Sequence, residues 1–114
     1  MRPWVIVAIV FLTLLILAVA LAYVGAQQPP VTVDMREFAF EPRDVLVTPG
    51  TAVRWVNRDD FPHSVVMEGG RPGSSRGTIP PGGEHTFVFR DPGRFVYRCS
   101  VHPTMLGEIT VGGQ

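Results

Sequence analysis

The sequence contains a single cysteine, Cys99, which is followed by His102 and then by Met105. A second histidine, His63, lies well upstream, directly after a proline. Together these residues offer one thiolate, two imidazoles and one thioether. A trigonal His₂Cys arrangement with a weak axial Met is typical of electron-transfer copper centres, because sulfur suits Cu(I) and imidazole suits both oxidation states. We therefore predict one copper ion, cycling between Cu(I) and Cu(II), with His63, Cys99, His102 and Met105 as its ligands.

The alternative for Cys99 is an inert buried thiol, because a lone cysteine has no partner for an internal disulfide. A Cys-x₂-His pair alone is a weak motif, but Met105 and a histidine from a separate strand favour metal binding. The third histidine, His85, opens a predicted strand, and we interpret it as a surface histidine. Met35 and Met67 follow no histidine at a useful spacing, so we expect both to pack in the core.

An apolar stretch without a charged residue precedes the rest of the chain, from Trp4 to Val24. As a helix rising ~1.5 Å per residue it would be about 30 Å long, close to the hydrocarbon thickness of a bilayer. We interpret residues 1–26 as a transmembrane anchor or a signal peptide. Val24-Gly25-Ala26 offers small residues for cleavage, but the stretch exceeds the ~7–15 residues of a usual signal core, which favours the anchor.

Charge indicates where the rest of the chain lies. Arg2 precedes the apolar stretch and no positive charge follows until Arg36. The positive-inside rule then places the C-terminal part outside the cytoplasm, in the periplasm or at the cell surface, and secreted if the segment is cleaved. The ten basic residues, all arginines, balance ten acidic residues and form no cluster, so nucleic acid is not an expected partner.

Beyond the apolar stretch we expect a linker, residues 27–30 (Gln-Gln-Pro-Pro), and one domain, residues 31–114. Short alternating or β-branched runs in the domain are separated by Pro, Gly, Asn and Asp. Seven strands are predicted, at Val31–Met35, Asp44–Val47, Ala52–Asn57, Ser64–Met67, His85–Phe89, Phe95–Cys99 and Glu108–Val111, with an eighth around Phe38–Phe40. The fold is therefore expected to be all-β, a Greek-key β-sandwich of seven to eight strands preceded by one hydrophobic helix.

Alternation within the strands predicts which side chains form the core. Phe95, Tyr97 and Cys99 share one face of a strand, so Cys99 should lie buried between the sheets while Arg98 points to solvent. Residues 68–77 show no strand pattern, and we interpret them as a flexible, solvent-exposed loop or alternatively as a loop that contacts a partner. The other residues predicted for the core are Val53, Trp55, Phe38, Phe40, Phe87 and Phe89.

From about Thr32 to Val111 the chain resembles the small cupredoxins. The matching stretches are Val53-Arg54-Trp55-Val56-Asn57-Arg58, Phe61-Pro62-His63, Asp91-Pro92-Gly93-Arg94-Phe95-Val96-Tyr97-Arg98-Cys99 and His102-Pro103-Thr104-Met105-Leu106-Gly107. The short spacing from His102 to Met105 is similar to that of the amicyanins; plastocyanin and pseudoazurin have a longer one. The resemblance implies a type 1 blue copper site, a β-sandwich and one-electron transfer outside the cytoplasm.

Two residues depart from the amicyanin pattern. The residue after the first histidine ligand is usually Asn, but here it is Ser64, which we expect to pair with Ser100. Many relatives have Pro two residues after the cysteine, whereas this chain has Val101. Because valine keeps the backbone N–H that proline lacks, we predict a hydrogen bond from Val101 to the Cys99 sulfur.

Two functions fit these residues. The first is a monomeric electron carrier whose donor and acceptor, a dehydrogenase or a respiratory-chain component, dock near His102. With the helix retained as an anchor, the partner is expected close to the membrane surface. The alternative is a membrane-associated protein that binds and delivers copper without carrying electrons. We predict no enzyme activity, because three histidines without a His-x-His pair cannot build an oxidase cluster.

Overall fold

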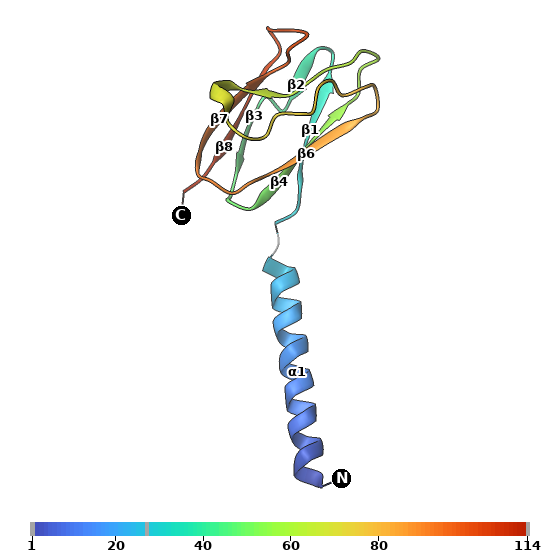
Figure 1. Cartoon of the computed structure of the whole chain (residues 1–114), viewed down its shortest axis with the longest axis vertical. Coiled ribbons are helices and arrows are strands. Elements are labelled where there is room, and N and C mark those ends of the chain that lie inside the picture. The colour runs from blue at the N-terminus through green and yellow to red at the C-terminus, as the bar shows by residue number, and fades with distance from the viewer. Residues whose placement is uncertain (1, 27, 114) are drawn as a thin grey trace.

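The computed structural model describes residues 2–26 and 28–113. In these residues the chain forms one long helix, eight strands and a short 3₁₀ turn (Figure 1). The helix α1 spans Pro3–Ala26. The strands are β1 Val31–Arg36, β2 Ala39–Glu41, β3 Asp44–Val47, β4 Thr51–Asn57, β5 Val66–Met67, β6 Glu84–Phe89, β7 Gly93–Arg98 and β8 Leu106–Val111, with the turn η1 at Glu68–Gly70.

The strands form two four-stranded sheets, in the orders β2-β1-β4-β6 and β3-β8-β7-β5. Strand β1 is parallel to β4, and β3 is parallel to β8. Because these neighbours are not consecutive in the sequence, the chain crosses between the sheets, as Greek-key connections require. The predicted β-sandwich is confirmed, including the short eighth strand. The predicted strand Ser64–Met67 is shorter than expected, because only Val66 and Met67 pair with β7.

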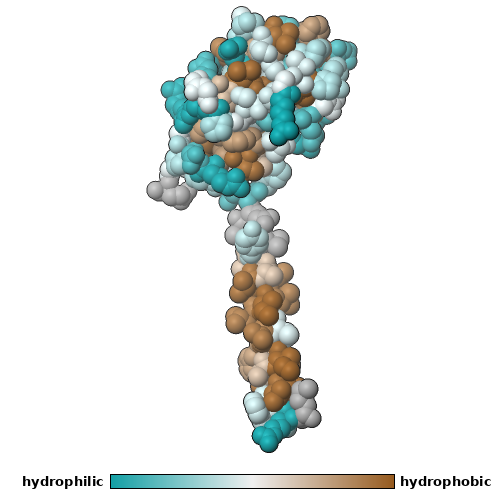
Figure 2. Space-filling view, viewed as in Figure 1, coloured by the Kyte–Doolittle hydropathy of each residue, from teal (hydrophilic) through white to brown (hydrophobic). Residues whose placement is uncertain are grey.

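The helix α1 carries no charged residue, and the side of it that Figure 2 shows is mostly hydrophobic. Its segment Pro3–Tyr23 is long and apolar enough to cross a membrane. At ~1.5 Å per residue, the 24 residues of α1 extend about 36 Å. A helix that is hydrophobic all round is suited to lipid rather than to one face of a water-soluble core.

Side chains from both sheets meet in one core, and strand alternation predicts most of it correctly. Phe95, Tyr97 and Cys99 are buried together, as expected. The other predicted core residues that are buried are Val53, Trp55, Phe40, Phe89, Met35 and Met67, and Phe87 packs partly buried against them. Phe38 is the exception: its side chain is 49% exposed. It lies in the two-residue turn between β1 and β2, where the alternation of buried and exposed side chains along a strand no longer applies.

Most of residues 68–77 are exposed to solvent, as expected, but hydrogen bonds tie part of the segment to the sheet. The hydroxyl groups of Ser74 and Ser75 accept hydrogen bonds from the backbone N–H groups of Met67 and Val65, at 2.9 and 3.0 Å. The backbone N–H of Ser75 donates to the carbonyl of Val65 at 2.8 Å. Ser74 and Ser75 therefore lie beside β5, whereas Glu68–Gly70 form the turn η1.

His85 is half-buried, so the expected surface position is only partly correct. Its ring stacks on buried Trp55, with centroids 5.4 Å apart. Its Nε2 lies 2.7 Å from the carbonyl oxygen of Gly73, in the segment just described. His85 thus joins the 68–77 segment to the sheet.

The sandwich has two distinct ends. At one end lie Val31, where the chain enters β1, and the turns that follow β3 and β6; Gly50 donates to Phe89 and Gly112 donates to Val47 there. We call this the base. Strands β1, β4 and β7 all run from the base to the opposite end, which carries the loop between β7 and β8 (Figure 1).

Candidate metal centre

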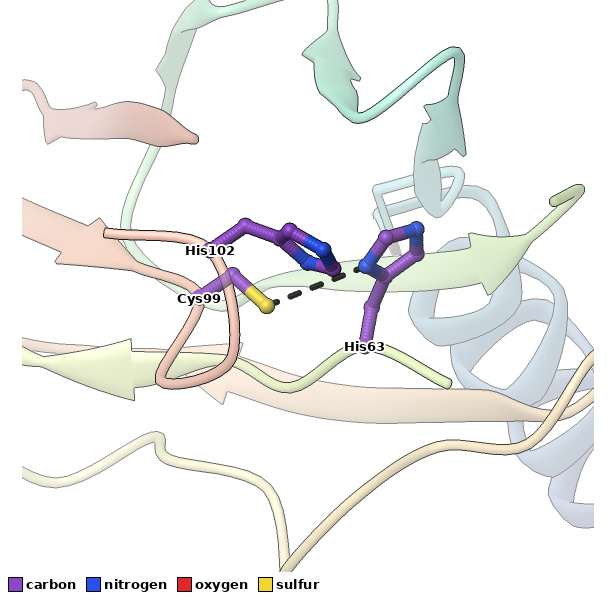
Figure 3. A group of neighbouring side chains, drawn as sticks. All are labelled: His63, Cys99 and His102. Atoms are coloured by element: carbon purple, nitrogen blue, oxygen red, sulfur yellow. Dashed lines mark hydrogen bonds between the residues drawn. The ribbon is translucent and has the colours of Figure 1, made fainter. Parts of the chain in front are cut away.

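Three side chains from separate parts of the sequence converge at the end of the sandwich opposite the base. One potential ligand atom each from His63, Cys99 and His102 lies within 4.8 Å of the others (Figure 3). The Nδ1 of His63 is 3.8 Å from the Cys99 sulfur. His63 follows β4, Cys99 directly follows β7, and His102 lies in the loop between β7 and β8. The structure thus brings three of the four predicted ligands together, although they come from different segments of the chain.

The fourth predicted ligand, Met105, closes the same loop. Its carbonyl accepts a hydrogen bond from the Cys99 N–H at 3.1 Å, and its own N–H donates to the carbonyl of His102 at 2.9 Å. The Met105 side chain is buried. Two backbone hydrogen bonds across seven residues make a tight loop, so Cys99, His102 and Met105 have little freedom to move apart.

His63 is fixed on both sides. Its backbone pairs with Ile79 as an isolated bridge, through hydrogen bonds of 3.1 and 2.6 Å. Its Nε2 lies 2.7 Å from a carboxylate oxygen of Asp59, and the ring is fully buried. An ionised carboxylate only accepts hydrogen bonds, so Nε2 carries a proton, and Nδ1 faces the Cys99 sulfur. A carboxylate partner of this kind orients metal-binding histidines.

Asp59 also holds the turn between β1 and β2. Its carboxylate accepts hydrogen bonds from the N–H groups of Glu37 and Phe38, at 2.7 and 3.0 Å. Both turn residues have positive φ, 53° and 58°, which costs roughly 1–3 kcal/mol each for non-glycine residues. Burial raises the pKa of Asp59, but the hydrogen bonds from Phe38, His63 and Glu37 outweigh it and leave that pKa below its usual value.

The turn held by Asp59 places an aromatic ring over both histidines. The Phe38 centroid lies 4.7 Å from the His102 ring and 5.4 Å from the His63 ring. Phe61 approaches His102 from another side, at 5.3 Å. Both phenylalanines are nearly half exposed. The imidazoles are therefore covered by aromatic side chains that also reach the surface.

Hydrogen bonds surround the sulfur of Cys99. The N–H of Ser64 donates to this sulfur at 3.4 Å. The Ser64 hydroxyl lies 2.8 Å from the Ser100 hydroxyl and accepts from the Ser100 N–H at 2.9 Å, so the expected serine pair is confirmed. Burial raises the pKa of the Cys99 thiol, but N–H groups of Ser64 and His102, the His63 imidazole and the Val101 N–H lower it to about 6. The thiolate is the form that binds metals.

These donors fit a copper ion. Within residues 2–26 and 28–113, the Nδ1 of His102 is buried and has no hydrogen-bond partner. Buried polar atoms are normally paired, so an unpaired one beside a thiolate and a second imidazole calls for a ligand. Two imidazole nitrogens and one thiolate, with a thioether in the same loop, are the donor set that suits copper.

The sequence model of the cupredoxin-like domain family matches residues 5–111. The chain belongs to the cupredoxin family. Amicyanin-alpha from Methylorubrum extorquens is 30% identical over 83 residues, which cover 69% of this chain and 69% of that protein. Amicyanin from Paracoccus denitrificans is 29% identical over 84 residues, 71% of this chain and 64% of that protein. Plastocyanin from Scenedesmus fuscus is 30% identical over 89 residues, which cover 68% of this chain and 91% of that protein.

Solved structures agree with the sequence relatives. A Cu(I) form of an amicyanin with a methionine-to-alanine substitution matches this cupredoxin with a TM-score of 0.68 at 27% identity. The match covers 73% of this chain and 82% of that one. The fold assigned from strand alternation and turn residues is therefore that of known copper proteins of similar size.

Sequence reasoning missed two residues of the cupredoxin site, Asp59 and the turn residue Phe38. Asp59 stands four residues before His63, but a carboxylate near a histidine is common and did not single it out. The turn Glu37-Phe38 contains neither Asn nor Gly, the usual residues of a two-residue hairpin, so its conformation carried no sequence signal.

We expect the Cys99 thiol of the metal-free cupredoxin to titrate with a midpoint near pH 6, because the pKa is lowered to about 6. An unfolded chain titrates near ~8.5. The folded form therefore gains stability as the pH rises from 6 to ~8.5, and this contribution is lost as the pH falls through 6. Ultraviolet thiolate absorbance measures the midpoint, with Cys99→Ser as the blank. A thiolate signal appearing only above pH 8 contradicts the prediction.

Proposed function

We propose that this cupredoxin is an extracytoplasmic type 1 copper protein that carries single electrons between redox partners. His63, Cys99, His102 and Met105 hold the ion. The observation that carries the proposal is the cluster itself, three donor atoms within 4.8 Å of one another; one of its residues, His102, has a buried ring nitrogen without a hydrogen-bond partner. Copper in such a site supplies a one-electron couple.

The chain's own contribution is to keep the ligands still. His63 is held by Ile79 and Asp59, and the cysteine loop is closed by its own backbone hydrogen bonds. The Ser64–Ser100 pair ties the two ligand-bearing segments to each other. Ligands fixed in this way rearrange little when the charge of the ion changes, so the barrier to electron transfer stays low.

The surface beside His102 is suited to brief contact with a redox protein. Phe38, Phe61 and Val101 are exposed around it, and Leu106 lines a shallow groove next to Phe38. We call these four residues the apolar face. It carries no charge of its own, and small interfaces are usual for redox encounters. The half-buried His102 ring links this face to the cluster.

We further propose that residues 1–26 remain as a membrane anchor, that residues 27–30 form a linker and that residues 31–114 are the cupredoxin domain. The length and apolar surface of α1 support the anchor. Arg2 at its start supports a location of the domain outside the cytoplasm, by the positive-inside rule. The mass of the protein extracted from membranes tells a retained anchor from a cleaved signal.

The visible spectrum and the voltammogram of the copper-loaded full chain test the electron-carrier function. We expect an intense blue thiolate-to-copper band and a reversible one-electron wave, because Cys99 and both histidines are placed to bind one ion. A colourless Cu(I) complex that does not cycle would contradict the carrier and support copper delivery instead.

Val101→Pro is expected to lower the reduction potential. The Val101 N–H contributes to the lowered pKa of the Cys99 thiol, and proline removes that N–H. Weaker withdrawal of charge from the sulfur stabilises Cu(II). If one hydrogen bond worth about 1 kcal/mol is lost in the reduced state only, the potential falls by about 40 mV. Voltammetry of both proteins measures the difference, with Val101→Ala as the control that keeps the N–H. An unchanged or higher potential in Val101→Pro would rule out an influence of the Val101 N–H on the sulfur.

A further inference from the structure

The base and the metal-bearing end of the sandwich lie at opposite ends of strand β1. The linker enters β1 at Val31, and the turn after Arg36 carries Phe38, which lies over both histidines. Six residues at ~3.3 Å each separate these ends by about 20 Å. In Figure 1 the helix and the loop between β7 and β8 accordingly lie at opposite ends of the domain. The ligand cluster is thus remote from the point of attachment.

The linker is too short to turn the domain over. From Ala26, the last residue of α1, to Val31 there are five Cα–Cα steps, which span at most ~18 Å when fully extended. If the apolar face rested on the bilayer, Val31 would stand about 20 Å above it, beyond that reach. The exposed Phe38 and Phe61 side chains therefore cannot enter the membrane that holds their own anchor.

Contacts at the base favour an upright domain. Gln28 and Pro29 line a shallow groove together with Val47, Thr48 and Thr51 at the base. Consecutive prolines at 29 and 30 favour an extended, semi-rigid backbone. Residues 28–30 therefore continue beneath the sandwich instead of leaving it sideways.

The outer faces of the two sheets offer little to attract a lipid surface. Four of their arginines lie beside carboxylates, which weakens the attraction that basic side chains have for anionic lipids. The pairs are Arg54–Glu84 at 3.6 Å, Arg58–Asp34 at 3.2 Å, Arg43–Asp44 at 2.9 Å and Arg94–Glu108. These ion pairs do not favour a domain lying on its side.

We propose that the anchored domain stands with its base on the membrane and its apolar face directed away from it, so that its electron partner is a water-soluble redox protein docking about 20 Å or more above the bilayer. The inference rests on the proposed copper function. It revises the expectation that the partner lies close to the membrane surface. A carrier embedded in the lipid does not reach a cluster at this height.

The orientation is tested with the copper-loaded full chain in phosphatidylcholine vesicles that carry a nitroxide spin label on the lipid headgroup. Paramagnetic Cu(II) shortens the relaxation of a nearby nitroxide, and diamagnetic Cu(I) does not. We expect equal nitroxide relaxation in the oxidised and reduced protein. Enhancement that disappears on reduction places the copper near the headgroups and overturns the orientation. A lipid-bound Cu(II) chelate shows that the label responds.

The partner class is tested by stopped-flow electron exchange with a small water-soluble c-type haem protein. The second-order rate constant is expected to agree within about twofold between vesicles and detergent micelles, and a tenfold lower value in vesicles overturns the proposal. Phe61→Ser is expected to lower this rate constant about fivefold or more, as the loss of a central apolar contact does. A rate constant unchanged in Phe61→Ser overturns docking at the apolar face.

Leu46→Ser is the matched control, because Leu46 is 75% exposed and lies near the base. Its rate constant should equal that of the wild type; slowing in Leu46→Ser with none in Phe61→Ser assigns docking to the base instead.

The two proposals fail differently. A wild-type chain without a blue band or a reversible wave refutes the copper function and this inference with it. A blue, reversible protein whose copper relaxes the lipid label refutes the orientation alone.

Discussion

Copper-loaded Cys99→Ser protein is expected to lack the intense blue band and to bind copper at least ~100-fold more weakly than the wild type. The visible band needs a thiolate bound to Cu(II), and a serine hydroxyl is neither soft nor ionised at neutral pH. Loss of an outer partner of a metal ligand already costs ~10–100-fold in affinity, so loss of a ligand costs more. Visible titration with Cu(II) and competition with a chelator measure the two effects.

The three histidines provide the matched comparison for this experiment. His63→Gln and His102→Gln should lose the blue spectrum, because these imidazoles lie in the cluster with Cys99. His85→Gln should keep it, because His85 stacks on Trp55 and contacts Gly73, outside that cluster. A blue Cys99→Ser protein would refute the proposed ligand set, and so would a His85→Gln protein that has lost its colour.

The grouping of Cys99, His102 and His63 was predictable because it depends on local spacing and on strand alternation. Cys99 follows Phe95 and Tyr97 on the buried face of one strand, and the structure buries all three. His102 and Met105 belong to the same short loop, so few arrangements were open to them. Only His63 depends on a long-range contact, with Cys99 36 residues later in the chain. It was expected at the site because it comes from a separate strand of the predicted sandwich.

The surroundings of the site were less predictable because they depend on contacts between distant segments. Phe38 leaves the core because Glu37 and Phe38 both adopt positive φ, a conformation that Asp59 stabilises from a different loop. The hydroxyl groups of Ser74 and Ser75 accept hydrogen bonds from backbone N–H groups at β5 that a neighbouring strand would otherwise bind. The alternation of hydrophobic residues cannot reveal such side-chain contacts. Alternation predicts which face is buried, but not which polar group satisfies a distant backbone.

Gly107→Ala is expected to destabilise the domain by about 3 kcal/mol, the upper part of the usual range for overpacking a core. Gly107 pairs with Tyr97 across β7 and β8. A methyl group at Gly107 would lie 2.7 Å from Cε2 of Tyr97 and closer still to its Cζ and hydroxyl. The Tyr97 ring cannot withdraw, because it is fully buried with Phe40 at 4.7 Å and Trp55 at 5.4 Å. Thermal unfolding of the metal-free full chain in detergent should show a melting temperature lower by about 15 °C.

Gly112→Ala is the control, because a methyl group there meets only the carbonyl of Val47, at an ordinary 3.7 Å. Its melting temperature should stay close to that of the wild type. The double variant Tyr97→Leu with Gly107→Ala separates a steric clash from a need for glycine itself: with the ring removed, Gly107→Ala should cost much less than it does beside Tyr97. An equal cost in both backgrounds would refute the clash. Because Tyr97 stands two residues before Cys99 on the same face of β7, a displaced ring should also disturb the sulfur, and the blue spectrum of Gly107→Ala would show it.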